Sequence, residues 1–225
     1  MPDIIKRPGF NLMAIQLHTF VFNGFGVNNY ILEAENGDCI IVDAACSNDS
    51  EKEQLKSFFS DSRRKPVMLI NTHTHIDHVL GCAFVQKKFG IPWLMHSEAL
   101  PTLNEAPVFA SLFGINNIEM SKPDNFLEDG QELLFDSNTI KILHTPGHAP
   151  GSICLYIPAE RMVITGDVLF NGSIGRTDLT GGNFDVLMES IHAKLLTLPD
   201  DTIVYPGHGP ATTIGDERTG NPYLG

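Results

Sequence analysis

The sequence has no apolar run near the ~18 residues needed to cross a bilayer, so we expect no membrane-spanning segment and no membrane partner. Its first residues, MPDIIKRPGFNLMA, lack the apolar stretch of a secretory signal peptide. Basic residues are few, with 15 Lys and Arg against 27 Asp and Glu and a net charge of −12. This balance argues against a nucleic-acid partner. An anionic substrate stays open, because a bound metal makes a cavity locally positive.

Cysteine is scarce, and its pattern excludes a redox or zinc-ribbon pair. The four residues Cys39, Cys46, Cys82 and Cys154 include no CxxC spacing. Most of them stand among apolar or small neighbours, which predicts buried free thiols and a reducing compartment. We therefore expect a cytoplasmic protein, and the sequence leaves its oligomeric state open.

The length of 225 residues and a hydrophobic content of 42% suit one domain, residues 1–225, with an ordinary core. Apolar runs predict strands at 14–22, 29–32, 39–42, 66–71, 92–95, 153–157, 162–165 and 202–205, and two more between 131 and 144. Helices are predicted at 49–60, with Ser47, Asp49 or Ser50 as N-cap, and at 81–88 and 184–197, with helix and loop over 98–125. The tail, 215–225, is expected to be the least structured. This order favours an α/β fold in which two sheets lie face to face with helices outside, an αββα sandwich.

One motif carries the functional argument. Residues 71–81 read NTHTHIDHVLG, directly after an apolar strand. In an extended chain His73, His75 and Asp77 point to the same side. His78 breaks this period and reaches the same region if the chain turns there. Imidazole and carboxylate are common zinc ligands, and the spacing could serve two adjacent ions.

Three further segments place a His or an Asp just past an apolar strand. Residues 144–152 read HTPGHAPGS, residues 164–170 read ITGDVLF and residues 204–210 read VYPGHGP. Each lies in a turn with Gly or Pro, which is how a loop presents a ligand from a rigid sheet.

Together the four segments resemble the metallo-β-lactamase superfamily, whose hallmark is HxHxDH followed by a His, an Asp and a His. The resemblance implies the αββα sandwich with the site at one edge between the sheets. It also implies a ligand set for two divalent ions, Zn²⁺ with Fe or Mn as alternatives. In that set His73, His75 and His148 hold one ion, Asp77, His78 and His208 hold the other, and Asp167 bridges them.

The remaining candidates have other expected roles. His144 is expected to end a strand outside the ligand set, and His18, His96 and His192 to be ordinary solvated or hydrogen-bonded residues. Asp43, which ends the run CIIVD, resembles a family Asp that ties down a ligand His.

The branch within the superfamily is indicated by residues 172–178, GSIGRTD, and by the ending GDERTGNPYL. Both resemble the short glyoxalase II-like (hydroxyacylglutathione hydrolase-like) branch. The chain ends about where the helical C-terminal domain of full-length glyoxalase II would begin, so that domain is not expected. Arg176 is a candidate for gripping a substrate carboxylate, or for an ion pair that pins the loop to Asp178.

The expected reaction is hydrolysis of a small thioester or ester, such as a hydroxyacylglutathione, by a hydroxide that bridges the two ions. Asp77 is the expected catalytic residue, because it can both ligate a metal and orient the nucleophile. GRTD stretches also occur in persulfide dioxygenases, so an oxidoreductase with a single iron is the alternative. A non-catalytic member and a nuclease are disfavoured by the complete ligand set and by the net charge.

Overall fold

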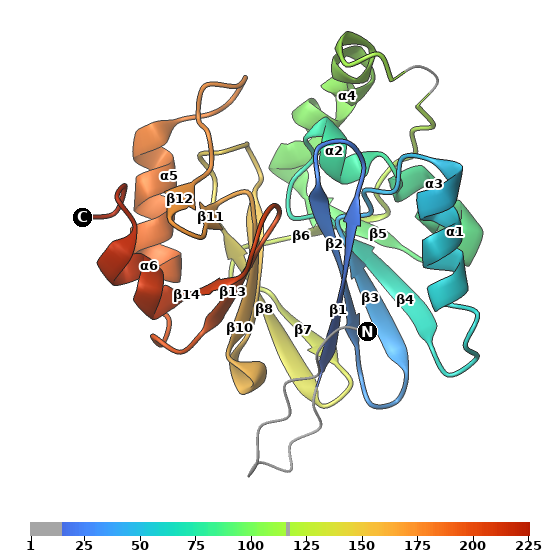
Figure 1. Ribbon diagram of the computed structural model, residues 1–225, viewed down its shortest axis with the longest axis horizontal. Helices are drawn as coiled ribbons and strands as arrows, with labels where there is room; N and C mark the ends of the chain where they lie inside the picture. Colours follow the sequence, from blue (N-terminus) through green and yellow to red (C-terminus); the bar gives the residue numbers. More distant parts are fainter. Residues whose placement is uncertain (1–14, 116–117) are drawn as a thin grey trace.

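The computed structural model describes residues 15–115 and 118–225. Two six-stranded sheets lie face to face with helices outside them, so the predicted αββα architecture is confirmed (Figure 1). Ala14, the first residue of the strand predicted over 14–22, lies outside the described residues, as do residues 116 and 117 of the segment 98–125. Within the described ranges no helix is long and apolar enough to cross a membrane.

The first sheet has the order β1-β2-β3-β4-β5-β6, antiparallel from β1 to β3 and parallel from β3 to β6. Its strands are β1 (Gln16–Phe22), β2 (Val27–Glu33), β3 (Asp38–Val42), β4 (Lys65–Ile70), β5 (Trp93–His96) and β6 (Asn125–Leu127). Its helices are α1 (Asp49–Phe58), α2 (Ile76–Val79), α3 (Cys82–Phe89) and α4 (Leu100–Leu112), with a 3₁₀ turn at Ser97–Ala99.

The second sheet has the order β14-β13-β10-β9-β8-β7. Its strands are β7 (Glu132–Phe135), β8 (Asn138–His144), β9 (Ile153–Ile157), β10 (Met162–Gly166), β13 (Ile203–Pro206) and β14 (Thr212–Thr213). A small hairpin, β11 (Leu169–Phe170) and β12 (Ser173–Ile174), follows β10. Helix α5 (Phe184–Ser190) continues as a π-helical turn at Ile191–Leu195, and α6 (Ile214–Gly220) ends the fold.

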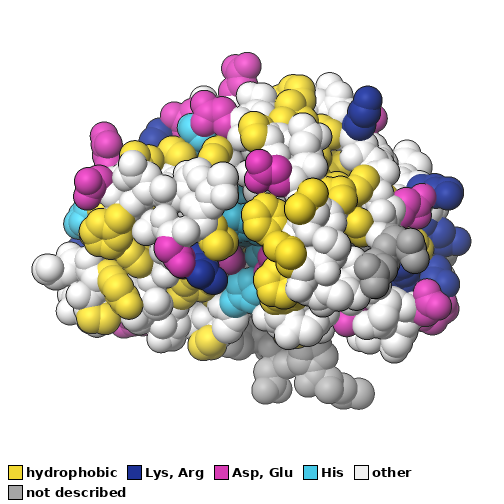
Figure 2. All heavy atoms as spheres, turned by 90° about the horizontal axis from the view of Figure 1, so that it is seen from above, with side chains coloured by type: hydrophobic (Ala, Val, Ile, Leu, Met, Phe, Trp, Pro, Cys, Tyr) yellow, Lys and Arg dark blue, Asp and Glu magenta, His cyan; other side chains and the backbone are white. Residues whose placement is uncertain are grey.

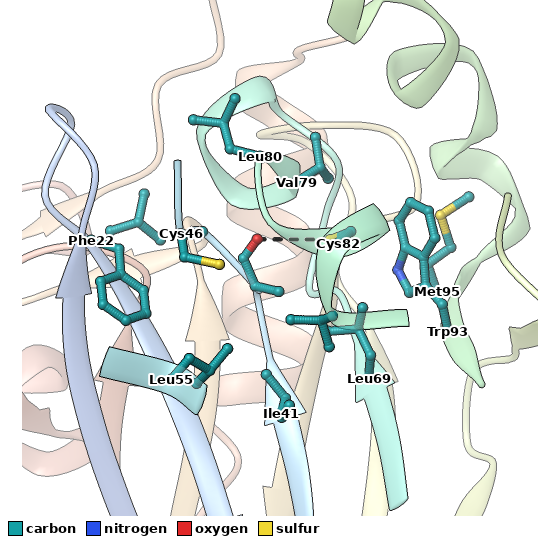
Figure 3. Packing of buried hydrophobic residues seen from close by; sticks show 14 of the residues in the cluster. Phe22, Ile41, Cys46, Leu55, Leu69, Val79, Leu80, Cys82, Trp93 and Met95 are labelled. Carbon is teal, nitrogen blue, oxygen red and sulfur yellow. Dashed lines mark hydrogen bonds between the residues drawn. The ribbon is translucent and has the colours of Figure 1, made fainter. Parts of the chain in front are cut away.

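The layers are held together by three apolar clusters. One lies between the sheets and includes Ile40 and Leu155. A second packs α1, α3 and α4 on the outer face of the first sheet, and Figure 3 shows its members Phe22, Leu55 and Leu69. The third packs α5 and α6 on the second sheet. Each sheet is therefore covered on both faces, which fixes its strand ends as a rigid frame for a site at the edge.

All four cysteines are buried and free, as the sequence predicted. Two of them, Cys46 and Cys82, lie within the apolar cluster of the first sheet (Figure 3). Their burial among apolar side chains stabilises the fold by packing.

Three local predictions were wrong. The N-cap of α1 is Asn48, whose side chain accepts from the backbone N–H of Glu51, and not Ser47, Asp49 or Ser50. The tail is not the least structured part, because α6 occupies Ile214–Gly220. The chain also becomes helical at Ile76, so Asp77 does not belong to an extended segment.

Candidate metal centre

The HxHxDH motif leaves the buried end of β4 and turns at once into α2. His73 and His75 lie in the non-helical segment after the strand, while Asp77 and His78 lie in the first turn of α2. Two different backbone conformations therefore bring the four side chains together, in place of the single extended segment that the sequence predicted. In an extended chain, the side chains of Asp77 and His78 would point to opposite sides. The helical turn brings both of them to the same region.

The other three candidates come from the second sheet. His148 follows β8, Asp167 follows β10 directly and His208 follows β13. A bridge between Val27 and His208 ties this edge to the start of β2. Strand ends of both sheets thus meet at one edge of the sandwich, near α2 in the upper part of Figure 1.

The seven side chains form two groups that share one carboxylate. The possible ligand atoms of His73, His75 and His148 lie within 4.8 Å of one another, and so do those of Asp77, His78 and His208. Oδ2 of Asp167 lies 3.7 Å from Nε2 of His148 and 3.5 Å from Nε2 of His208. Asp167 therefore faces both groups, the position expected of a bridging ligand.

The chemistry of the donors fits metal ions. Nε2 of His73 and Oδ1 of Asp167 are buried and have no hydrogen-bond partner among the described residues. An orphaned buried polar atom is costly, and a metal bond is one way to satisfy it. Nδ1 of His75 lies 2.9 Å from Nε2 of His148, so at least one of these nitrogens must present a lone pair that a cation could share.

Three of the imidazoles are oriented by their second ring nitrogen. Nδ1 of His148 donates to the carbonyl of Arg176 at 2.8 Å, and Nδ1 of His208 donates to the carbonyl of Phe25 at 3.1 Å. Nδ1 of His78 lies 3.0 Å from Oδ2 of Asp43, as the resemblance implied for this Asp. Such contacts fix the tautomer and leave Nε2 free to bind a metal.

The electrostatics prepare the site for cations. Burial, followed by the charge of neighbouring imidazoles, holds the pKa of His73 well below its ordinary value and lowers that of His75 to about 4. Burial opposes ionisation of Asp167, yet the nearby His78, His148 and His208 together outweigh it and lower the pKa of that carboxyl. Neutral imidazoles and an ionised carboxylate are the protonation states in which these side chains bind metal.

His78 and His208 differ from the other imidazoles. Burial lowers the pKa of each, but nearby carboxylates outweigh it and the net shift is upward, well above the ordinary value for His78. Asp77 and Asp167 contribute to both shifts, and Asp43 adds to that of His78. Metal binding at this group must therefore displace protons.

Two glycines, which sequence reasoning did not single out, make room for these ligands. A Cβ on Gly207 would lie 2.1 Å from Oδ1 of Asp167 and 2.8 Å from Cε1 of His78. A Cβ on Gly175 would lie 2.0 Å from the carbonyl oxygen of Asp167. The sequence did contain a signal for both glycines. Gly207 directly precedes His208 in PGHGP, and Gly175 lies in GSIGRTD, the segment that packs against Asp167.

The other histidines lie elsewhere. His144 stacks on His96 with ring centroids 4.0 Å apart, and its Nε2 lies 3.5 Å from Glu98, in a group separate from the seven side chains. His18 pairs with Glu33, and His192 is exposed on the π-helical turn.

Five of the seven side chains line a pocket of about 750 Å³, namely His75, Asp77, His148, Asp167 and His208. Figure 2 shows His side chains in a hollow between two raised parts of the surface, with hydrophobic side chains on both sides. Arg176 lines the pocket but forms a two-fold ion pair with Asp178, with both N–O distances 2.7 Å. Of the two roles considered for Arg176, the structure shows the pairing with Asp178.

Comparison with known proteins agrees with the metal centre that the geometry indicates. The sequence pattern of the metallo-beta-lactamase superfamily matches residues 22–208. The probable metallo-hydrolase YqgX of Bacillus subtilis is 38% identical over 199 residues, which cover 88% of this chain and 92% of that protein. The hydroxyacylglutathione hydrolase GloC of Haemophilus influenzae is 41% identical over 159 residues, which cover 70% of this chain and 75% of that protein.

Solved structures give the same picture. The BLEG-1 B3 metallo-beta-lactamase has a TM-score of 0.84 at 36% identity, covering 93% of this chain and 99% of its own. TTHA1623, solved in a di-iron-bound form, has a TM-score of 0.82 at 34% identity, covering 92% of this chain and 100% of its own.

Proposed function

Since this chain belongs to the metallo-beta-lactamase superfamily, we propose that it is a dinuclear metal-dependent hydrolase of a thioester, such as a hydroxyacylglutathione. The observation that carries the proposal is the complete set of seven donors in two groups, with the Asp167 carboxylate facing both. The similarity to GloC supports the thioester, because that relative is named a hydroxyacylglutathione hydrolase.

His73, His75 and His148 would hold one ion, Asp77, His78 and His208 the other, and Asp167 would bridge them. Imidazole and carboxylate donors suit Zn²⁺, and the same donors accept iron or manganese. The di-iron form of TTHA1623 supports two ions as the occupancy and keeps iron as an alternative. Two divalent ions held here would supply a hydroxide near neutral pH and a positive charge beside the acyl carbonyl.

The residues of the chain do the positioning. Asp77 is held ionised, because nearby His78 and His208 outweigh the effect of burial and lower its pKa. Its Oδ2 lies 3.2 Å from Nε2 of His208, so it can ligate there and orient the attacking oxygen. A thiolate leaving group, with an ordinary pKa near ~8.5, departs without strong help from a general acid. The described residues that line the pocket include no lysine that could serve as a general acid.

The four buried free thiols support a cytoplasmic location as part of the same proposal. The partner that we propose is a small thioester or ester. The acidic net charge of −12 continues to argue against a nucleic acid.

The test is a paired assay of the purified protein, loaded with zinc in one sample and with ferrous iron in another, on S-D-lactoylglutathione and on glutathione persulfide. We expect free thiol to appear from the thioester, measured with Ellman's reagent, while an oxygen electrode records no uptake. Oxygen uptake on the persulfide, with no cleavage of any thioester, would assign the chain to the dioxygenases instead.

A further inference from the structure

The walls of the pocket above the metal centre are apolar. Large side chains come from the β1–β2 turn, from α4 and the residue after it, from β11 and from the loop that follows β12. They are Phe25, Phe109, Leu112, Phe113, Phe170 and Leu179. A wall of this kind recognises a ligand by burying apolar surface, with a few polar groups to fix its orientation.

Several of these side chains are exposed to an unusual degree. Leu112 is 74% exposed, Phe113 59% and Phe25 39%, although each lines the pocket. The rings of Phe25 and Phe113 meet edge to face with centroids 5.1 Å apart, which joins the β1–β2 turn to the end of α4. Large apolar side chains left exposed together at the mouth of a pocket mark a binding site.

The charges of the pocket do not suit a substrate arm with several carboxylates. Arg176 is the one Lys or Arg among the described lining residues, and Asp178 already neutralises it. Glu105, on α4, adds a negative charge to the lining. Beyond the metal centre, an anionic arm would therefore meet no free cation on the described walls.

We propose that this pocket binds an apolar acyl group, aliphatic or aryl, whose carbonyl lies at the metal centre and whose chain packs between α4 and the β1–β2 turn. The inference rests on the proposed thioester hydrolysis and narrows its substrate, from the hydroxyacylglutathione given there as an example to thioesters with an apolar acyl group. In that reaction the C–S bond breaks, a C–O bond forms from water, and a carboxylate, a thiol and a proton are released. The oxidation states do not change, so the reaction needs water but no oxidant or reductant.

The first experiment keeps the thiol constant and varies the acyl group. The zinc-loaded enzyme is assayed on acetyl, lactoyl, butanoyl, hexanoyl and phenylacetyl thioesters of N-acetylcysteamine. We expect kcat/KM to rise about fourfold for each methylene that the pocket buries, and so by about two-hundredfold over the four methylenes from acetyl to hexanoyl. Lactoyl, which is short and polar, should stay close to acetyl. A flat series, or a preference for lactoyl, would overturn the inference.

The second experiment places a charge on the wall and a matched charge beside it. Leu112 and Val108 are both exposed on α4, at 74% and 64%, but only Leu112 lines the pocket. Leu112→Asp should lower the ratio of kcat/KM for the hexanoyl thioester to kcat/KM for the acetyl thioester more than tenfold. Val108→Asp should leave kcat/KM for each of the two thioesters unchanged. An equal loss on both substrates in Leu112→Asp would show a structural effect and would contradict the inference.

A binding measurement separates this inference from the proposed reaction. Calorimetry of the zinc-loaded protein with hexanoate and with lactate reports on the pocket whether or not any thioester is cleaved. Tighter binding of hexanoate, weakened in Leu112→Asp, supports the apolar pocket even if no thioester is hydrolysed. Equal binding of the two acids would overturn the pocket inference, even for an active thioesterase.

Discussion

Oδ2 of Asp43 lies 3.0 Å from Nδ1 of His78, and both side chains are buried from solvent. The same carboxylate accepts hydrogen bonds from the backbone N–H and the hydroxyl of Thr72. With Asp43 as acceptor, His78 keeps a proton on Nδ1 and turns Nε2 toward Asp77, Asp167 and His208, where a metal would displace the second proton. Asp43 holds this contact with a positive φ of 52°, a conformation uncommon for a residue other than glycine.

Asp43→Asn should weaken metal binding by roughly 10- to 100-fold, because the amide would present a donor to Nδ1 of His78 and favour the wrong tautomer. Metal affinity, measured by competition with a chromophoric chelator, checks this. Asp136→Asn is the matched control, since Asp136 also has a φ of 52° but is exposed in the turn between β7 and β8. An unchanged affinity in Asp43→Asn would remove the orienting role.

Asp167→Ala should lower activity at least ~100-fold, since this carboxylate faces both groups of ligands. It should also abolish most of the rise in melting temperature that metal gives the wild-type protein, because that rise is binding free energy. Calorimetry with and without added zinc measures the rise. Asp185→Ala, at an exposed position in the first turn of α5, is the control. A variant that retained two metals and wild-type turnover would refute the bridging role.

Gly207→Ala should damage the centre by sterics alone, because its Cβ would press on Asp167 and on His78. We expect a lower metal content, measured by elemental analysis, and a loss of roughly 1–3 kcal/mol in the free energy of unfolding from overpacking. Gly220→Ala, where a Cβ meets nothing within 4 Å, should change neither. Equal metal content in the two variants would contradict the close packing at Gly207.

The four thiols give a prediction about pH. Burial raises the pKa of Cys39, Cys46 and Cys154 to about 12, and that of Cys82 well above its ordinary value. The pKa of each thiol is higher in the folded protein than in the unfolded chain. The contribution of each thiol to the free energy of unfolding is therefore fully present below the unfolded-state pKa near ~8.5, and it is lost as the pH rises toward ~12. Each thiol should lower the free energy of unfolding by up to ~1.4 kcal/mol per pH unit in that range.

Ellman's reagent measures the same burial directly. At pH ~8 the native protein should react slowly, and all four thiols should react once it is unfolded. A thiol that reacts within seconds in the native protein would contradict the buried state.

The sequence predicted the strands well, because buried strands are short apolar runs, and the seven side chains that it singled out lie together in the structure. The position of Asp77 was misjudged, since the i, i+2 spacing of the motif imitates a strand where the chain is already helical. Helix α4 was hard to recognise for another reason. It has a proline within it, Pro107, and apolar residues on both its buried and its exposed side, such as Leu103 and Leu112. The exposed side of α4 carries apolar residues such as Leu112 because this side lines the pocket.

The tail illustrates a tertiary cause. Helix α6 carries few apolar residues, so its periodicity is weak, yet Glu217 is buried within it. The carboxylate of Glu217 accepts from the hydroxyl of Thr212, the amide of Asn221 and the backbone N–H of Gly172. These partners satisfy a buried charge and hold the helix in place. Gly172 and Thr212 lie outside residues 215–225, so the sequence of the tail alone does not predict these hydrogen bonds.

The central claim, two ions bridged by Asp167, is tested most directly by a crystal structure of the zinc-loaded protein with anomalous data at the zinc edge. We predict two anomalous peaks ~3.5–4 Å apart, with ligand distances of ~2.0–2.2 Å to the seven side chains and none to His144. A single peak, or a zinc bound by His144 in place of His148, would contradict the account.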